Sequence, residues 1–217
     1  MTTMRTVGVE EELLVVDAAG NPVPLAPEAL VVAARRGDGE TVEEHDRAER
    51  MSTPADDDGM EADAAPGAQL VPELKEQQIE FGTRVCAELA EVAAELRHWR
   101  SRADDAARSV GARVAALATA PVPVQPTPTP GRRYRRMLET FGLTALEQLT
   151  CGCHVHVSVQ DDEEGVAVLD RIRVWLPILT ALTANSPFWL GQDSGYASFR
   201  SQAWNRWPSA GPTGPFG

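Results

Sequence analysis

Three consecutive glutamates, Glu10, Glu11 and Glu12, interrupt an aliphatic stretch that runs from Val7 to Val16. The β-branched and aliphatic flanks favour a strand, in which successive side chains point to opposite faces. Glu10 and Glu12 are therefore expected to share one face, roughly 6–7 Å apart along the chain, while Glu11 points to the other. An enclosed pair of carboxylates needs a cation, because a buried unpaired carboxylate costs several kcal/mol. Mg²⁺ prefers such oxygen ligands, and a solvated acidic edge strand is the alternative.

Two further segments are expected to be strands that carry polar residues on one face. Over residues 75–83, Ile79 and Phe81 alternate with Gln78 and Glu80. Residues 151–159 alternate as strictly, and one face of that strand would carry Gly152, His154, His156 and Ser158. If the three strands share a sheet, the carboxylates and imidazoles converge in one groove. Such a groove suits metal-assisted phosphoryl transfer.

The two cysteines of the last strand belong to its other face. Cys151 and Cys153 alternate with the histidines, so one metal ion cannot collect thiols and imidazoles together without a bulge. Both cysteines are instead expected to be small buried side chains that face a helix. The chain has no Gly-rich phosphate loop and no dinucleotide fingerprint, which disfavours a P-loop or Rossmann mechanism.

Helical periodicity is found in four segments. A short helix is expected over residues 28–36. Another is expected over residues 132–140, which begin with a cluster of arginines; this basic face either is solvated or binds a nucleotide. A long amphipathic helix is expected over residues 85–117, packed on the sheet, with a coiled-coil homodimer as the alternative. A last amphipathic helix is expected over residues 165–185.

The negative charge is concentrated in one segment. Between Asp38 and Glu80 there are 14 acidic and three basic residues, which accounts for most of the net charge of −12. Residues 37–72 are expected to form a mobile acidic insertion with a helical piece near residues 42–51. The acidic balance disfavours nucleic acid as a partner. The three cysteines, with no secretory signal or membrane-spanning apolar run, predict a reduced, cytoplasmic protein without a membrane partner.

The final segment, residues 185–208, is rich in aromatic residues and arginine. Arginine binds carboxylate or phosphate in a bidentate manner, so Arg200 is a candidate for an anionic group of the substrate, with a structural ion pair as the alternative. The Pro- and Gly-rich stretch 207–217 resembles a loop that leads onward. A frayed terminal tail would look similar and is the alternative.

Five motifs occur in a specific order along the chain. They are Gly8–Leu13, Gln77–Glu80, Cys151–Val157, Asn185–Trp189 and Gly195–Arg200. Together they resemble the bacterial glutamate–cysteine ligase family 2, the carboxylate-amine ligases. The resemblance implies an α+β, glutamine-synthetase-like fold, in which an antiparallel sheet has helices packed on one side. It also implies a single catalytic domain over residues 1–217 that is incomplete at its C-terminus.

The resemblance implies an activity as well. ATP and Mg²⁺ would phosphorylate the γ-carboxylate of glutamate, and the amine of cysteine would attack the acyl phosphate to give γ-glutamylcysteine, a step of low-molecular-weight thiol biosynthesis. Two alternatives stay open. One is a broader carboxylate-amine ligase that uses another small amine, and the other is a catalytically incomplete fragment that binds only metal or nucleotide.

Roles for individual residues follow from the same resemblance. The implied metal ligands are Glu10, Glu12, Glu80 and His154. The implied catalytic residues are Glu80 and Arg200. The implied substrate-binding residues are His156, Tyr196 and Arg200. The chain departs from the family pattern in two ways, because the acidic insertion is longer and family members continue beyond Gly217. The resemblance therefore implies that the chain is the N-terminal portion of such a ligase.

Overall fold

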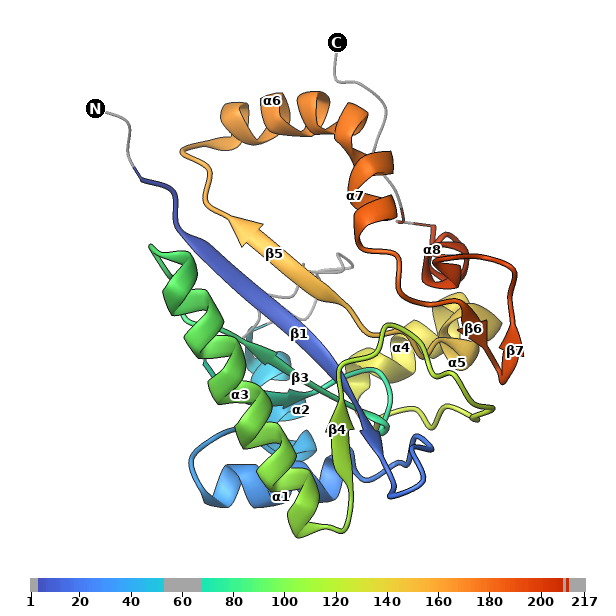
Figure 1. The fold of residues 1–217 in the computed structure, drawn as a ribbon. Helices are drawn as coiled ribbons and strands as arrows, with labels where there is room; N and C mark the ends of the chain where they lie inside the picture. Colours follow the sequence, from blue (N-terminus) through green and yellow to red (C-terminus); the bar gives the residue numbers. More distant parts are fainter. Residues whose placement is uncertain (1–3, 53–67, 209, 211–217) are drawn as a thin grey trace.

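A computed structural model describes residues 4–52, 68–208 and 210 (Figure 1). The fold is α+β, and a five-stranded sheet lies at its centre. The strands are β1 (Val7–Val16), β2 (Leu70–Pro72), β3 (Gln78–Gly82), β4 (Arg113–Ala115) and β5 (Cys153–Val157). Their order is β2-β3-β1-β4, β5 also pairs with β1, and every pairing is antiparallel.

Strand β1 is the centre of this sheet because it pairs with three other strands. Its middle pairs with β3, so that Glu12 lies opposite Glu80. Its first half pairs with β5, so that Glu10 lies opposite His154. The prediction that the three polar strands share one sheet is therefore confirmed. The observed β3 and β5 are shorter than the expected ranges 75–83 and 151–159.

Two helices cover one face of the sheet. Helices α1 (Ala26–Arg35) and α3 (Leu89–Ser109) pack on it and enclose the largest apolar core. Leu13, Ile79 and Phe81 are almost completely buried in this core, and burial of each such side chain contributes about 1.5–3 kcal/mol. Because side chains alternate along β1, the opposite face carries Glu10 and Glu12.

Glu11 lies on the helix-covered face, as the alternation of β1 predicts. It is buried, with 4% of its surface exposed. Its carboxylate accepts two hydrogen bonds from Arg100 of α3, from Nε at 2.7 Å and from an Nη atom at 2.6 Å. This bidentate ion pair supplies the cation that an enclosed carboxylate requires.

The long helix predicted over residues 85–117 is wrong at its C-terminal end. Helix α3 stops at Ser109, and Gly111 has a φ of +82°, a conformation that glycine adopts without steric cost. The chain then reverses, and Arg113–Ala115 form β4, which pairs with the end of β1. The backbone N–H and C=O groups of β4 are satisfied by pairing with β1, although the apolar spacing of these residues alone predicts a helix.

The helix predicted over residues 165–185 is also divided. It consists of α6 (Asp162–Ile172), a 3₁₀ turn η1 (Arg173–Trp175) and α7 (Leu176–Leu182). Pro177 lies in the first turn of α7, where its missing N–H and its ring disfavour continuation from the preceding turn. Figure 1 shows that α6 and α7 bend away from β5.

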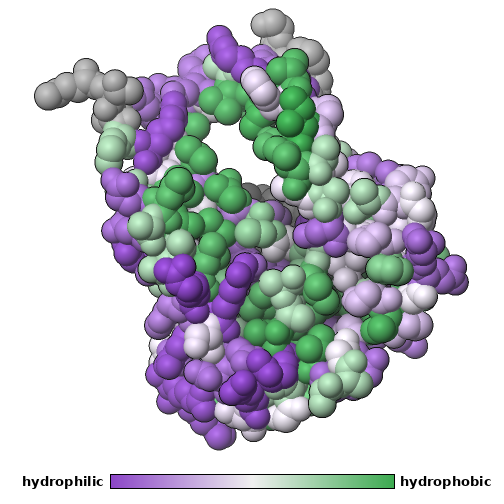
Figure 2. Space-filling model, viewed as in Figure 1, coloured by the Kyte–Doolittle hydropathy of each residue, from purple (hydrophilic) through white to green (hydrophobic). Residues whose placement is uncertain are grey.

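This bend leaves apolar side chains exposed. Figure 2 shows them as green surface around an opening beside β5. The exposed residues of β5, α6, η1 and α7 include Val155, Val157, Leu169, Ile172, Trp175, Ile178, Leu179 and Leu182. Among the described residues, no helix is long and apolar enough to cross a membrane.

The predicted acidic insertion contains regular structure at both ends. Helix α2 (Val42–Ser52) matches the expected helical piece. Leu70–Pro72, expected in the insertion, form the buried strand β2, and Leu70 also bridges to Gly39. Three residues are too few for a recognisable strand pattern. Residues 53–67 lie outside the described part of the chain.

The remaining elements flank the sheet. They are α4 (Arg132–Phe141), α5 (Leu143–Glu147), the hairpin of β6 (Phe188–Trp189) and β7 (Gln192–Asp193), and α8 (Phe199–Trp204). The predictions of a short N-terminal helix and of a helix at the arginine cluster are confirmed by α1 and α4.

Candidate active site

The open face of the sheet gathers the predicted metal ligands. Glu10 and Glu12 come from β1, Glu80 lies opposite Glu12 on β3, and His154 lies opposite Glu10 on β5. His156, two residues along β5, lies opposite Gly8 and shares the same face. The structure thus places all four predicted metal ligands on one face, although it does not bring their ligand atoms together at one point.

One compact cluster of potential metal ligands is present in the described residues. The Oε2 atom of Glu10 lies 3.3 Å from Nδ1 of His154 and 3.0 Å from Nε2 of His156. The ligand atoms of these three residues all lie within 4.8 Å of one another. The Glu10 side chain is only 14% exposed, whereas those of His154 and His156 are 47% and 57% exposed. The cluster is therefore anchored in the sheet and open to solvent.

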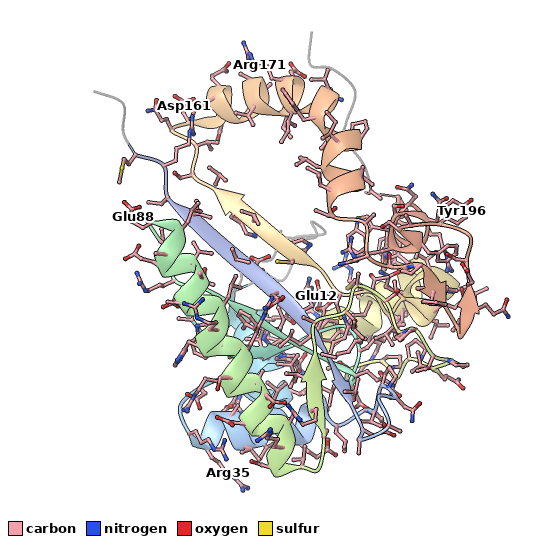
Figure 3. The ribbon with its side chains drawn as sticks, viewed as in Figure 1. Glu12, Arg35, Glu88, Asp161, Arg171 and Tyr196 are labelled. Carbon is pink, nitrogen blue, oxygen red and sulfur yellow. The ribbon has the colours of Figure 1, made fainter. Side chains whose placement is uncertain are left out.

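Glu12 lies deeper and is held by hydrogen bonds. Its Oε2 atom accepts from the backbone N–H of Gly152 at 3.0 Å and from Nε2 of Gln78 at 3.3 Å. The backbone N–H of Glu12 in turn donates to the carbonyl of Gly152 at 3.0 Å. These contacts fix the carboxylate between β3 and the segment that leads into β5 (Figure 3).

The charge of this carboxylate is destabilised by its surroundings. Loss of contact with water is the main reason that the pKa of Glu12 is raised to about 8, and repulsion by Glu73 adds to the effect. Attraction by the Arg200 guanidinium acts in the opposite direction. Burial and the neighbouring carboxylate thus both disfavour the charged form of Glu12.

Gly152 makes the close packing of this face feasible. A Cβ atom at this position would lie 2.7 Å from Nε2 of His154 and 3.2 Å from Oε1 of Glu12. Ordinary contacts of a Cβ atom are about 3.4 Å or longer, so any larger residue displaces its neighbours. The absence of a side chain at Gly152 lets the imidazole and the carboxylate approach each other.

Arg200 lies at the edge of this face. Its Nε atom donates to the carbonyl of Cys151 at 2.8 Å, and its guanidinium lies 5.1 Å from the centre of the Trp204 ring. Tyr196, by contrast, is 51% exposed and lies at the periphery of the molecule, remote from Glu12 (Figure 3). Of the two residues predicted from the final segment, only Arg200 lies near the carboxylates.

The prediction that both cysteines are buried is correct for Cys151 and wrong for Cys153. Cys151 is buried, but it packs with Leu14 and Leu149 beside Gln78 and not against the long helix as expected, and Cys153 is exposed. Burial and the nearby Glu11 carboxylate still raise the pKa of the Cys153 thiol. The Arg100–Glu11 ion pair lies beside this position in place of the apolar helix face that was expected.

Sequence reasoning missed three residues near Glu12. Gln78 was placed on the polar face of β3 with Glu80 but was assigned no role at the site. Gly152 was placed on the correct face, but spacing alone does not indicate a close approach. Glu73 follows the three-residue strand β2 and carries no signal in the sequence.

An apolar pocket of about 280 Å³ lies beside this face. Its walls include Ala120, Val124, Leu149 and Trp189, with Glu147 among the lining residues. Leu149 is two residues before Cys151, which contacts Gln78. The pocket therefore adjoins the carboxylate face through the segment that precedes β5.

Comparison with known proteins decides the family. The model of the glutamate–cysteine ligase family 2 matches residues 6–217. The chain belongs to this family. The resemblance inferred from the five motifs is thereby confirmed.

Curated relatives of the family are similar along nearly the whole chain. "Putative glutamate–cysteine ligase 2-1" of Paenarthrobacter aurescens is 52% identical over 216 residues, which cover 99% of this chain and 50% of the relative. The protein of the same name from Streptomyces avermitilis is 50% identical, over 99% of this chain and 52% of the relative. "Putative glutamate–cysteine ligase 2" of Streptomyces coelicolor is 48% identical, with the same two coverages. The chain spans about half the length of the curated relatives it matches.

Proposed function

We propose that this chain contributes to an ATP-dependent glutamate–cysteine ligase, which joins the γ-carboxylate of glutamate to the amine of cysteine through an acyl phosphate. The observation that carries the proposal is that Glu10, Glu12, Glu80 and His154 lie on one open face of the sheet in a chain that belongs to this family. The names of the relatives point to the same reaction.

The antiparallel sheet supports a glutamine-synthetase-like architecture as part of this proposal. Helices cover one face, and the polar residues occupy the other. In that architecture the polar face would form one wall of the funnel that holds the substrates. The single catalytic domain over residues 1–217 is proposed on the same basis.

The carboxylates fit Mg²⁺. Glu12 is enclosed and has other carboxylates beside it, so its pKa is raised and its negative charge is destabilised, an effect that a bound cation would offset. Glu12 and Glu80 would hold Mg²⁺, with Glu10 and His154 as the remaining predicted ligands. When bound, Mg²⁺ would neutralise the charge of the transferring phosphoryl group.

The other residues are assigned to substrates. Arg200, at the edge of the face, would orient an anionic group of glutamate or of the acyl phosphate, and Glu80 would keep the phosphoryl group aligned through the metal. Tyr196 is remote from Glu12, so we assign it no contact with the reacting groups. The apolar pocket beside Trp189 would take the adenine ring of ATP, because a flat apolar ring stacks well on tryptophan.

The test is release of ADP by the full chain in the presence of Mg²⁺ and ATP. Release that requires glutamate and cysteine together, with γ-glutamylcysteine identified by mass spectrometry, is the expected result. Release with other small amines at equal rates would favour the broader carboxylate-amine ligase. No release above background from folded protein would reject the enzyme and leave a fragment that binds metal or nucleotide. Quenching of Trp189 fluorescence by ATP, absent in Trp189→Phe, tests the nucleotide pocket separately.

A further inference from the structure

Helix α2, in the acidic insertion, is attached to the rest of the molecule on two sides. Just before α2, the backbone N–H of Glu40 donates to the carbonyl of Leu70 in β2 at 3.1 Å. On the other side, Oδ1 of Asp46 accepts from the backbone N–H of Arg132 at 2.7 Å and satisfies a donor of the first turn of α4. The arginine cluster of α4, expected either to be solvated or to bind a nucleotide, therefore meets acidic residues of α2.

His45 lies between two carboxylates of this region. Its Nδ1 atom is 2.6 Å from Oε1 of Glu40, and its Nε2 atom is 3.4 Å from Oε1 of Glu49, one turn further along α2. The imidazole is only 14% exposed. The buried Nε2 atom makes an ion pair with Glu49 rather than a well-aligned hydrogen bond. Each nitrogen of the ring therefore faces a carboxylate oxygen.

Glu49 extends this contact to α4. Its Oε1 atom accepts a hydrogen bond from an Nη atom of Arg133 at 3.3 Å. The chain of contacts thus runs from the backbone of β2 through α2 to α4. We call the four side chains that form it the α2 clasp: Glu40, His45, Glu49 and Arg133.

The two carboxylates favour a proton on each nitrogen of His45. A neutral imidazole has one N–H and one lone pair, so one carboxylate would face a lone pair. The 2.6 Å contact with Glu40 favours the proton on Nδ1, which leaves the lone pair of the neutral form on Nε2, against Glu49. Burial opposes the positive charge, but Glu49 and Glu40 outweigh it, and the pKa of His45 is raised above its ordinary value.

The charged neighbours of the imidazole do not titrate in the same range of pH. Burial acts to raise the pKa of Glu49, but His45 and Arg133 outweigh it, so that the pKa is lowered. The pKa of Asp46 is lowered as well, first by a backbone N–H at the start of α4. Arg133 stays protonated, and β2 consists of the non-titratable residues Leu70–Pro72. Of these groups, His45 is the one whose charge changes near neutral pH.

We propose that the α2 clasp is sensitive to pH: protonated His45 holds α2 on α4, and loss of that proton loosens α2. Deprotonation ends the ion pair with Glu49 and turns the Nε2 lone pair towards its carboxylate, whereas the contact of Asp46 with α4 stays. The folded chain binds the proton of His45 more tightly than the unfolded chain does. The stabilisation is therefore complete below the pKa of an unfolded histidine, and it is lost as the pH rises through the pKa of folded His45.

The α2 clasp adjoins a segment that leads to the candidate active site. Strand β2 ends directly before Glu73, whose carboxylate repels Glu12 on the open face. Loosening of α2 therefore acts on the strand that positions this segment. The proposal goes beyond the ligase reaction and does not depend on it.

The wild-type chain tests the proposal without any substitution. NMR titration gives the pKa of His45 in the folded chain and in urea, and hydrogen–deuterium exchange gives the protection of residues 42–52 between about pH 5.5 and pH 8.5. We expect a higher pKa in the folded chain. Protection of α2, corrected for the intrinsic exchange rate, should fall roughly tenfold as His45 loses its proton. Protection that stays constant over this range, or a pKa that is not raised, would overturn the proposal.

Variants assign the effect to the α2 clasp. His45→Gln cannot take up a proton, so its α2 should be weakly protected at every pH. Glu49→Gln should lower the pKa of His45, an effect that a merely structural role of His45 does not produce. His98→Gln is the matched control, because His98 is exposed on α3 and lies outside the clasp, and it should retain the pH dependence of the wild type.

Two results would refute the assignment of residues. They are a wild-type pH dependence in His45→Gln and an unchanged pKa of His45 in Glu49→Gln. Unchanged circular dichroism shows that the variants are folded. All measurements use the chain without nucleotide or metal, so their outcome is separate from that of the ADP-release test.

Discussion

Replacement of Gly152 by alanine tests whether a missing side chain keeps the open face assembled. The new Cβ atom would lie 2.7 Å from Nε2 of His154, so the imidazole must move by roughly 0.7 Å to reach an ordinary contact. Oε1 of Glu12, 3.2 Å from the same Cβ atom, must move by a few tenths of an ångström. Overpacking of this kind costs about 1–3 kcal/mol. The cost should fall near the lower limit, because the end of a half-exposed imidazole can rotate away.

Gly8→Ala provides the matched control for this substitution. Gly8 lies in β1 of the same sheet, whereas Gly152 directly precedes β5, and a Cβ atom at Gly8 meets nothing within 4 Å. Both substitutions reduce the entropy of the unfolded chain by a similar amount, which stabilises the fold by about 0.4–1 kcal/mol. We therefore expect Gly8→Ala to be neutral or slightly stabilising, and Gly152→Ala to be less stable than Gly8→Ala by about 1–2 kcal/mol.

Two measurements separate stability from site geometry. Urea unfolding gives the free-energy difference, and calorimetric titration with Mg²⁺ gives the effect on the predicted metal ligands. Displacement of His154 and Glu12 should weaken Mg²⁺ binding roughly tenfold in Gly152→Ala and leave it unchanged in Gly8→Ala. Equal stability and equal Mg²⁺ affinity in the two variants would refute the argument that Gly152 is required by close packing.

Three further predictions concern charged residues. Glu10→Gln should weaken Mg²⁺ binding measured by calorimetry and Glu11→Gln should not, because only the first carboxylate lies on the open face; equal losses would contradict this assignment. Glu11→Gln should instead lower the free energy of unfolding in urea by about 1–2 kcal/mol, because it breaks the bidentate pair with Arg100, whose half-exposed guanidinium can regain water. Lys75 is fully buried, its Nζ atom donates to the carbonyl of Leu146, and loss of hydration lowers its pKa to about 8. The unfolded lysine binds its proton more tightly, so the free energy of unfolding of the wild type should rise between pH 8 and 10.5. Lys75→Met lacks this dependence, so its free energy of unfolding in urea, relative to that of the wild type, should be highest near pH 7 and fall towards pH 10. A difference that stays constant with pH would contradict the lowered pKa of Lys75.

The sequence predicted the face of the sheet on which each glutamate lies. Strict alternation over residues 7–16 separates Glu11 from Glu10 and Glu12, and the same rule applied to Glu80 and His154 places them beside the open pair. Those predictions depend only on the two-residue period of a strand, which long apolar runs specify strongly.

Features that depend on three-residue strands or on single residues were not predictable in the same way. Residues 113–115 continue a helical apolar spacing, and their pairing with β1 depends on the reversal at Gly111. The position of Glu73 beside Glu12 depends on the path of the chain after β2. Cys153 alternates correctly, yet it is exposed because, among the described strands, β5 pairs only with β1 and all five of its residues are exposed. In each case the long-range arrangement of the chain overrides the local pattern.

The unpaired edge of β5 affects how metal binding can be measured. In the described part of the chain β5 hydrogen-bonds only with β1, and Val155 and Val157 on it are more than half exposed. Such an edge is a template for pairing with a second chain. Two molecules joined along β5 would bring four imidazoles to a common seam, where an ion could bridge the chains. Stoichiometry at low protein concentration therefore distinguishes a site within one molecule from one created by self-association.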